Sequence, residues 1–112
     1  MTGIQRIGNV FYRATDMEAA VRFYTDVLGL SLKFRDGDRW VAFDVGGTTM
    51  ALEGGPPQAG ATVSLRVEGL SDFVDQLKAG GASVGPIQTG PHERRAELID
   101  PAGNTLILYE PA

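Results

Sequence analysis

The chain has 112 residues, of which 43% are apolar and 21% are charged, the composition of one ordinary globular domain with its own core. A formal net charge of −4 and the lack of cysteine exclude a basic surface for nucleic acid or anionic membrane, and also exclude disulfides and cysteine-bound zinc. The sequence shows neither an apolar leader nor a membrane-length apolar run, so we expect a cytoplasmic protein.

The first half of the chain predicts the element order βαβββ. Residues 7–14 mix β-branched and aromatic side chains, which is typical of a strand. Thr15 or Asp16 then offers a helix cap, and apolar residues at spacings of three and four predict a helix that ends at Gly29. The apolar stripe of this helix contains Met17, Ala20, Val21, Tyr24, Val27 and Leu28. Three further strands are expected at 30–35, 40–45 and 48–53.

The second half repeats this order after the segment GGPPQAG at 54–60, whose glycines and prolines predict a linker. A strand at 61–67 precedes an apolar stripe of helical spacing that ends at Gly80-Gly81. The last three strands are expected at 82–84, 94–99 and 104–109. We therefore predict a single domain over residues 1–112 that contains a first module at 4–53, the linker at 54–60 and a second module at 61–112.

Two stretches of the chain are distinctive, ATDMEAAVRFYTDVLGL at 14–30 and IDPAGNTLILYEP at 99–111. They resemble the vicinal oxygen chelate superfamily, which contains glyoxalase I, extradiol dioxygenases, fosfomycin-resistance enzymes and bleomycin-resistance proteins. The resemblance implies an α+β fold in which two pseudo-symmetric βαβββ modules form a cupped mixed sheet with the site inside the cup. It also implies a homodimer.

Metal-dependent members of that superfamily carry a His at the start of the first strand of a module and a Glu in its last strand. The resemblance and the internal repeat put Asn9, Ala51, Thr62 and Ile107 at these four places. A divalent transition ion needs imidazole or carboxylate ligands, which none of the four supplies. We therefore expect no metal and no other cofactor, which disfavours the metal-assisted glyoxalase and dioxygenase reactions.

Strand alternation predicts most of the side chains that line the cup, and the aromatic character of Trp40 and Phe43 adds these two as stacking candidates. The expected ligand-binding residues are Asn9, Phe11, Trp40, Phe43, Ala51, Glu53, Thr62, Ser64, Arg66, Arg95, Ile107 and Tyr109. Purely structural interpretations stand beside these. Trp40 and Phe43 also suit a core or an interface, where such residues are more often found. Arg66 suits an ion pair with Glu53 or Glu97 equally well. The only histidine, His92, is better suited to a solvated loop.

The leading functional hypothesis is a binding protein that sequesters a planar or aromatic small molecule without turnover and without a catalytic residue, as the bleomycin-resistance branch does. An alternative is a metal-free isomerase, epimerase or lyase in which His92, Glu97, Glu53 or Tyr109 moves a proton. A third is a plain interaction module, because one architecture hosts many activities.

Overall fold

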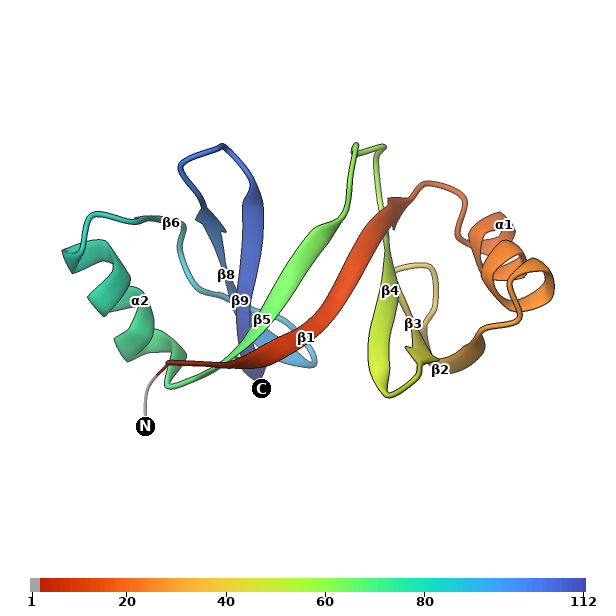
Figure 1. Ribbon diagram of the computed structural model, residues 1–112, viewed down its shortest axis with the longest axis horizontal. Coiled ribbons are helices and arrows are strands. Elements are labelled where there is room, and N and C mark those ends of the chain that lie inside the picture. The colour runs from red at the N-terminus through yellow and green to blue at the C-terminus, as the bar shows by residue number, and fades with distance from the viewer. Residues whose placement is uncertain (1–2) are drawn as a thin grey trace. The chain divides into compact units, whose positions relative to one another are not determined.

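The computed structural model describes residues 3–112, which divide into two compact units (Figure 1). The N-terminal unit comprises Asn9–Ala61, and the C-terminal unit comprises Thr62–Ala112 together with the residues up to Gly8. Residues 4–8 are expected in the first module, but their contacts group them with the second half of the chain. None of the helices in the described part of the chain is long and apolar enough to cross a membrane.

The N-terminal unit contains a four-stranded mixed sheet with one helix. Its strands are β1 (Gly3–Ala14, which enters this unit at Asn9), β2 (Ser31–Asp36), β3 (Trp40–Val45) and β4 (Thr48–Gly54). They lie in the order β2-β3-β4-β1, in which β1 runs parallel to β4 and the other pairs are antiparallel. The helix α1 (Met17–Arg22) begins at Asp16, whose carboxylate accepts a hydrogen bond of 3.1 Å from the Ala19 amide.

The C-terminal unit repeats this plan. Its elements are β5 (Thr62–Glu68), α2 (Leu70–Ala79), β6 (Ser83–Val84), β7 (Gln88–Thr89), β8 (Glu93–Ile99) and β9 (Thr105–Pro111). The strand order is β5-β9-β8-β6, with β5 parallel to β9 and with β7 paired to β8 as well. The predicted α+β class and the mixed sheet are confirmed, and β7 is an addition too short for a sequence pattern to predict.

The registers of the two parallel strand pairs agree with the internal repeat. Phe11, two residues after Asn9, lies opposite Ala51, and Ser64, two residues after Thr62, lies opposite Ile107. Asn9 and Ala51 in the N-terminal unit therefore have the same cross-strand relation as Thr62 and Ile107 in the C-terminal unit. This is the register that the alignment of the two halves requires.

The first helix differs from the prediction at its C-terminal end. After Arg22 the chain forms a π-helical turn, η1 (Phe23–Val27), in which the Leu28 amide donates to the Phe23 carbonyl. Such a turn holds one more residue than an α-helical turn, so it rotates the following side chains off the apolar stripe. Val27 and Leu28, predicted to pack on the sheet, are exposed as a result.

Each unit has its own apolar core between its helix and one face of its sheet. In the N-terminal unit Met17 and Val21 of α1 pack with Val41, Phe43 and Leu52. In the C-terminal unit the core contains Val67, Leu70, Val74, Ala96 and Leu108. Because side chains alternate along a strand, the residues between these point to the other side of each sheet, which we call the helix-distal face.

Candidate functional site

The helix-distal face of the N-terminal unit carries an apolar row across its four strands. Phe11, Ala51, Ala42 and Phe34 are successive cross-strand neighbours in this row. Ala51 is fully buried and Phe11 and Ala42 nearly so, whereas Phe34 on the edge strand is exposed. The small side chains of the two alanines make the middle of the row lower than its two ends, where the aromatic rings lie.

A polar row lies two residues further along β1 and β4 on the same face. It contains Arg13, Glu53 and Trp40. The Arg13 guanidinium lies 3.0 Å from the Glu53 carboxylate, and it also donates to the Pro56 carbonyl and to the Gln58 side chain. The Trp40 ring meets the Phe11 ring edge to face, with 5.3 Å between the centroids. Arg13 and Glu53 thus neutralise each other beside an aromatic pair.

Phe43 does not join this face, which corrects its assignment as a lining residue. It is fully buried on the helix side, where its ring lies 5.4 Å from that of Tyr24. Trp40 and Phe43 are three residues apart in one strand, an odd spacing that directs their side chains to opposite faces. Phe43 is therefore a core residue, whereas Trp40 lies on the helix-distal face.

Asn9 supplies a polar atom that the described residues do not satisfy. Its side-chain oxygen is buried and accepts no hydrogen bond from any described group. A buried acceptor without a donor costs about 1–3 kcal/mol, so this atom is suited to a donor from outside the chain.

In the C-terminal unit the equivalent of the apolar row contains Ser64, Ile107 and Glu97. Ser64 and Ile107 are buried, Glu97 is exposed, and Thr62 is buried two residues before Ser64. The Ser64 hydroxyl thus takes the place of the Phe11 ring, and Thr62 takes the place of Asn9.

The next row in this unit, here called the arginine row, contains Arg66, Tyr109, Arg95 and Gln88 on β5, β9, β8 and β7. Burial raises the pKa of Tyr109, an effect that the charges of Arg6 and Arg66 oppose and that of Glu93 reinforces. The Tyr109 hydroxyl therefore stays protonated at neutral pH. A side chain at Gly8 would overlap this hydroxyl, so the glycine makes room for it.

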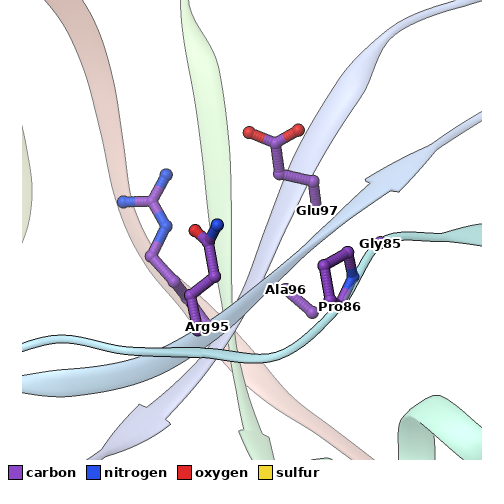
Figure 2. A pocket seen from close by; sticks show the side chains of 6 residues that line it. Gly85, Pro86, Arg95, Ala96 and Glu97 are labelled. Carbon is purple, nitrogen blue, oxygen red and sulfur yellow. The ribbon is translucent and has the colours of Figure 1, made fainter.

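A hollow of about 120 Å³ adjoins the arginine row (Figure 2). Its lining consists of Gly85, Pro86, Gln88, Arg95, Ala96 and Glu97. It lies at the break between β6 and β7, where β8 exchanges one edge partner for the other. Its volume is well below the roughly 300–1,000 Å³ of drug-sized pockets, so it fits a single functional group.

The remaining charged candidates of this unit serve the fold. Arg94 points to the helix side, where its guanidinium lies 2.7 Å from the Glu110 carboxylate and donates to the Ser71 hydroxyl. His92 is exposed next to the start of β8, and its carbonyl accepts a hydrogen bond from the Ala112 amide.

The residues at the four expected metal places do not fit a metal ion. Ala51 and Ile107 carry no donor atom, and the neutral oxygens of Asn9 and Thr62 are weak ligands for a transition ion. Within residues 3–112 no group of three or more His, Asp or Glu side chains is placed to hold a metal.

Sequence reasoning did not assign Phe34, Ala42 and Gln88 to these rows. The bulge in β2 between Leu32 and Phe34 shifts the alternation, so that Phe34 faces the same side as Ala42. Gln88 lies in a two-residue strand that carries no periodic signal.

The comparisons with known sequences and with solved structures agree with each other. Residues 6–108 match the family model described as Glyoxalase/Bleomycin resistance protein/Dioxygenase superfamily. An uncharacterized protein of Mycolicibacterium smegmatis is 34% identical over 101 residues, which are 86% of this chain and 85% of that protein.

Two solved structures share the fold. A glyoxalase/bleomycin resistance protein/dioxygenase superfamily member from Vibrio splendidus 12B01 is 16% identical with a TM-score of 0.71, over 96% of this chain and 99% of that chain. Methylmalonyl-CoA epimerase from Mycobacterium tuberculosis is 20% identical with a TM-score of 0.79, over 97% of this chain and 89% of that chain. With the family match over nearly the whole sequence, the chain belongs to the glyoxalase/bleomycin resistance protein/dioxygenase superfamily.

Proposed function

We propose that this protein binds a planar or aromatic small molecule without a metal ion and sequesters it, as a resistance protein of the bleomycin type does. The observation that carries the proposal is the chemistry of the four places where metal ligands are expected. They hold Asn9, Ala51, Thr62 and Ile107. Ala51 lies between Phe11 and Ala42, and Ile107 lies between Ser64 and Glu97. Such a mixture of apolar walls with a few polar heads is how small-molecule sites are usually lined.

The apolar row of the N-terminal unit supports the choice of a planar compound. Ala42 and Ala51 lie low between Phe11 and Phe34, and Trp40 stands next to Phe11 in the neighbouring row. Ala42 and Ala51 are themselves buried, so a flat ring would meet the side chains that keep exposed surface, the exposed Phe34 and the half-buried Trp40, at their faces or edges, arrangements that aromatic pairs favour.

The first test compares metals with planar compounds by thermal unfolding of the purified protein. Ligands that prefer the folded state stabilise it by about 2.7 kcal/mol at one hundred times Kd. We expect the melting temperature to rise with members of a panel of planar aromatic natural products and to stay unchanged with Ni²⁺, Zn²⁺ or Mn²⁺. A rise with a metal alone, together with stoichiometric metal by elemental analysis, would overturn the proposal.

A substitution of Trp40 tests whether the ligand binds beside the aromatic residues of the N-terminal unit. Trp40→Leu removes the aromatic face and should weaken a stacked ligand by roughly two- to tenfold, the range that aromatic contacts of about 0.5–1.5 kcal/mol imply. Phe23→Leu is the matched control, because Phe23 is an exposed aromatic residue on η1 of the same unit. Equal affinities in the two variants would place the ligand elsewhere.

A second candidate function is a metal-free isomerase, epimerase or lyase. The observation in its favour is Glu97, an exposed carboxylate on the rim of the hollow next to Arg95. A general base must lie within hydrogen-bond reach of the proton that it removes. Turnover of a bound compound that disappears in Glu97→Gln with affinity intact would favour this candidate over sequestration.

A further inference from the structure

The linker after β4 is held against the N-terminal unit by one side chain. Residues 55–61 belong to this unit and form no backbone–backbone hydrogen bond within the described chain, residues 3–112. Instead the Arg13 guanidinium donates to the Pro56 carbonyl at 3.3 Å and to the Gln58 side-chain oxygen at 3.1 Å. We call residues 55–58 the strap, because Arg13 holds them on the helix-distal face of the sheet.

Gly55 lets the strap lie close to Arg13. A Cβ atom at this glycine would lie 2.8 Å from Arg13 Nη1, and its φ of +146° favours glycine. The closed strap still leaves the guanidinium incompletely satisfied, because Arg13 Nε is buried without an acceptor among the described residues. A buried donor without an acceptor is unfavourable, so the strap is a replaceable partner for this arginine.

The strap offers neutral oxygens to an arginine whose charge is already balanced. The Glu53 carboxylate lies 3.0 Å from the Arg13 guanidinium, and the two side chains are only 20% and 21% exposed. A second carboxylate at this guanidinium would face the negative charge of Glu53 in a place with little water, where like charges repel strongly. A neutral carbonyl oxygen avoids this repulsion and accepts the same hydrogen bonds.

The strap begins beside the aromatic pair of the same unit. Glu53 is the cross-strand neighbour of Trp40, and the Gly54 amide donates to the Arg39 carbonyl at 3.0 Å. Arg13 and Trp40 are two strands apart, a separation of about 10 Å. This is the span of a two-ring aromatic compound with one substituent. A ring packed on the half-buried Trp40 therefore brings its substituent to Arg13.

We infer that the strap occupies the place of a ligand oxygen, and that a planar aromatic compound with a neutral carbonyl group opens the strap by taking over its hydrogen bonds to Arg13. The ring of this compound packs on Trp40. The inference rests on the proposed function for the planar ring and on the contacts of Arg13 for the oxygen and the strap. It narrows the ligand class from planar compounds to aromatic ketones, quinones and amides.

Native-state cleavage tests the strap without any ligand. Pancreatic elastase cleaves after small residues such as Ala59 and Ala61, which are exposed and follow the strap. Cleavage of a segment that opens transiently follows the population of its open form. Gln58→Ala removes one strap hydrogen bond and leaves Arg13 and Glu53 in place. Cleavage after these two alanines should become roughly two- to tenfold faster, the factor that the loss of one hydrogen bond implies.

Two further variants control this measurement. Gln76→Ala removes an exposed glutamine of α2 in the other unit and should leave the cleavage rate unchanged. Arg13→Lys keeps a positive charge beside Glu53 but loses the fork, so it should accelerate cleavage as well. A rate in Gln58→Ala equal to that of the wild type would overturn the inference.

A pair of aromatic probes tests the oxygen. The compounds 2-acetylnaphthalene and 2-isopropylnaphthalene share the ring and the shape of the substituent, and they differ in one carbonyl oxygen. Trp40 is the only tryptophan, so its fluorescence reports binding. The ketone should bind roughly fivefold tighter than the hydrocarbon, as the net gain of one hydrogen bond implies. Arg13→Met/Glu53→Met removes both charges together and should abolish this difference.

The strap and the anion give two further expectations for the ketone. Gln58→Ala should raise its affinity roughly two- to fivefold, because the strap then competes less for Arg13, whereas Gln76→Ala should not change it. The anion 2-naphthoate should bind more weakly than the ketone because of Glu53. Lower ketone affinity in Gln58→Ala, or tighter binding of naphthoate, would overturn the inference.

The same probes distinguish failure of the inference from failure of the proposed function. Equal binding of the ketone and the hydrocarbon overturns the inference and leaves the planar-ligand proposal standing. If neither compound binds, although elastase cleavage responds to Gln58→Ala as expected, the planar-ligand proposal fails and the strap stands.

Discussion

At the scale of single residues, Gly8 is a position that leaves no room for a side chain. A Cβ atom built there would overlap the hydroxyl and ring of Tyr109. We predict that Gly8→Ala destabilises the protein by about 1–3 kcal/mol, the usual cost of overpacking. Chemical denaturation measures the loss. The same substitution should also displace the Tyr109 ring.

The control is Gly80→Ala at the end of α2, where the nearest atoms to a Cβ lie 3.6 Å away and the backbone φ is negative. Its stability should stay within about 0.5 kcal/mol of the wild type. The double variant Gly8→Ala/Tyr109→Leu relieves the overlap, so the two changes should cost less together than their sum. Strict additivity would show that Tyr109 is not the obstacle.

Residue patterns could predict the face on which most candidate residues lie, but they did not do so for Phe43. Alternation along a strand placed Phe11, Ala51, Ser64 and Ile107 on the helix-distal faces, where the registers put them. Phe43 was assigned by its aromatic character, although its odd distance from Trp40 already directed it to the core. The fit of Tyr109 against Gly8 joins residues far apart in the chain, so no local pattern carries it.

At the scale of elements, the start of α2 depends on a side chain from the last strand. Gly69 at the cap position has no side chain to offer, and the Glu110 carboxylate accepts the Leu70 amide at 2.8 Å instead. Glu110 is itself held by Arg94. We predict that Glu110→Ala destabilises the protein by about 1–2 kcal/mol, as the loss of a helix cap does. Thermal and chemical unfolding measure the effect.

Glu110→Gln keeps an oxygen acceptor of the same length, so it should lose less than Glu110→Ala. Asp75→Ala, on an exposed position of the same helix, serves as the neutral comparison. Equal losses in Glu110→Ala and Glu110→Gln would mean that the ion pair with Arg94 matters and the cap does not.

The order of elements followed from the sequence, because apolar periodicity and turn residues are local signals. The Asp16 cap was one of two predicted candidates and is the one observed. The π-helical turn η1 has no such signal, since the spacing of Tyr24, Val27 and Leu28 fits an uninterrupted α-helix. The cap from Glu110 could not be predicted either, because its partner lies 40 residues earlier.

At the scale of the whole molecule, the segment from η1 to β2 exposes more apolar surface than a monomer needs. Phe23, Val27, Leu28 and Leu32 are each between 46% and 69% exposed. Contiguous exposed apolar side chains are typical of protein interfaces, and oligomers of a single chain are most often twofold dimers. We therefore predict a homodimer in which a second copy of the chain covers this segment, in agreement with the homodimer that the family resemblance implies.

Sedimentation velocity tests the prediction, with an expected mass of twice the 11.9 kDa of one chain. Val27→Asp places a charge on the most exposed of the four side chains and should shift the dimer toward monomer, because an unpaired charge is costly to bury at an interface. Ala19→Asp adds the same charge at an exposed position of α1 and should leave the dimer intact. A wild-type monomer at all concentrations would contradict the dimer itself. If the dimer survives Val27→Asp, its interface must lie on another surface. Burying the aspartate without a partner would cost more free energy than a modest interface contributes.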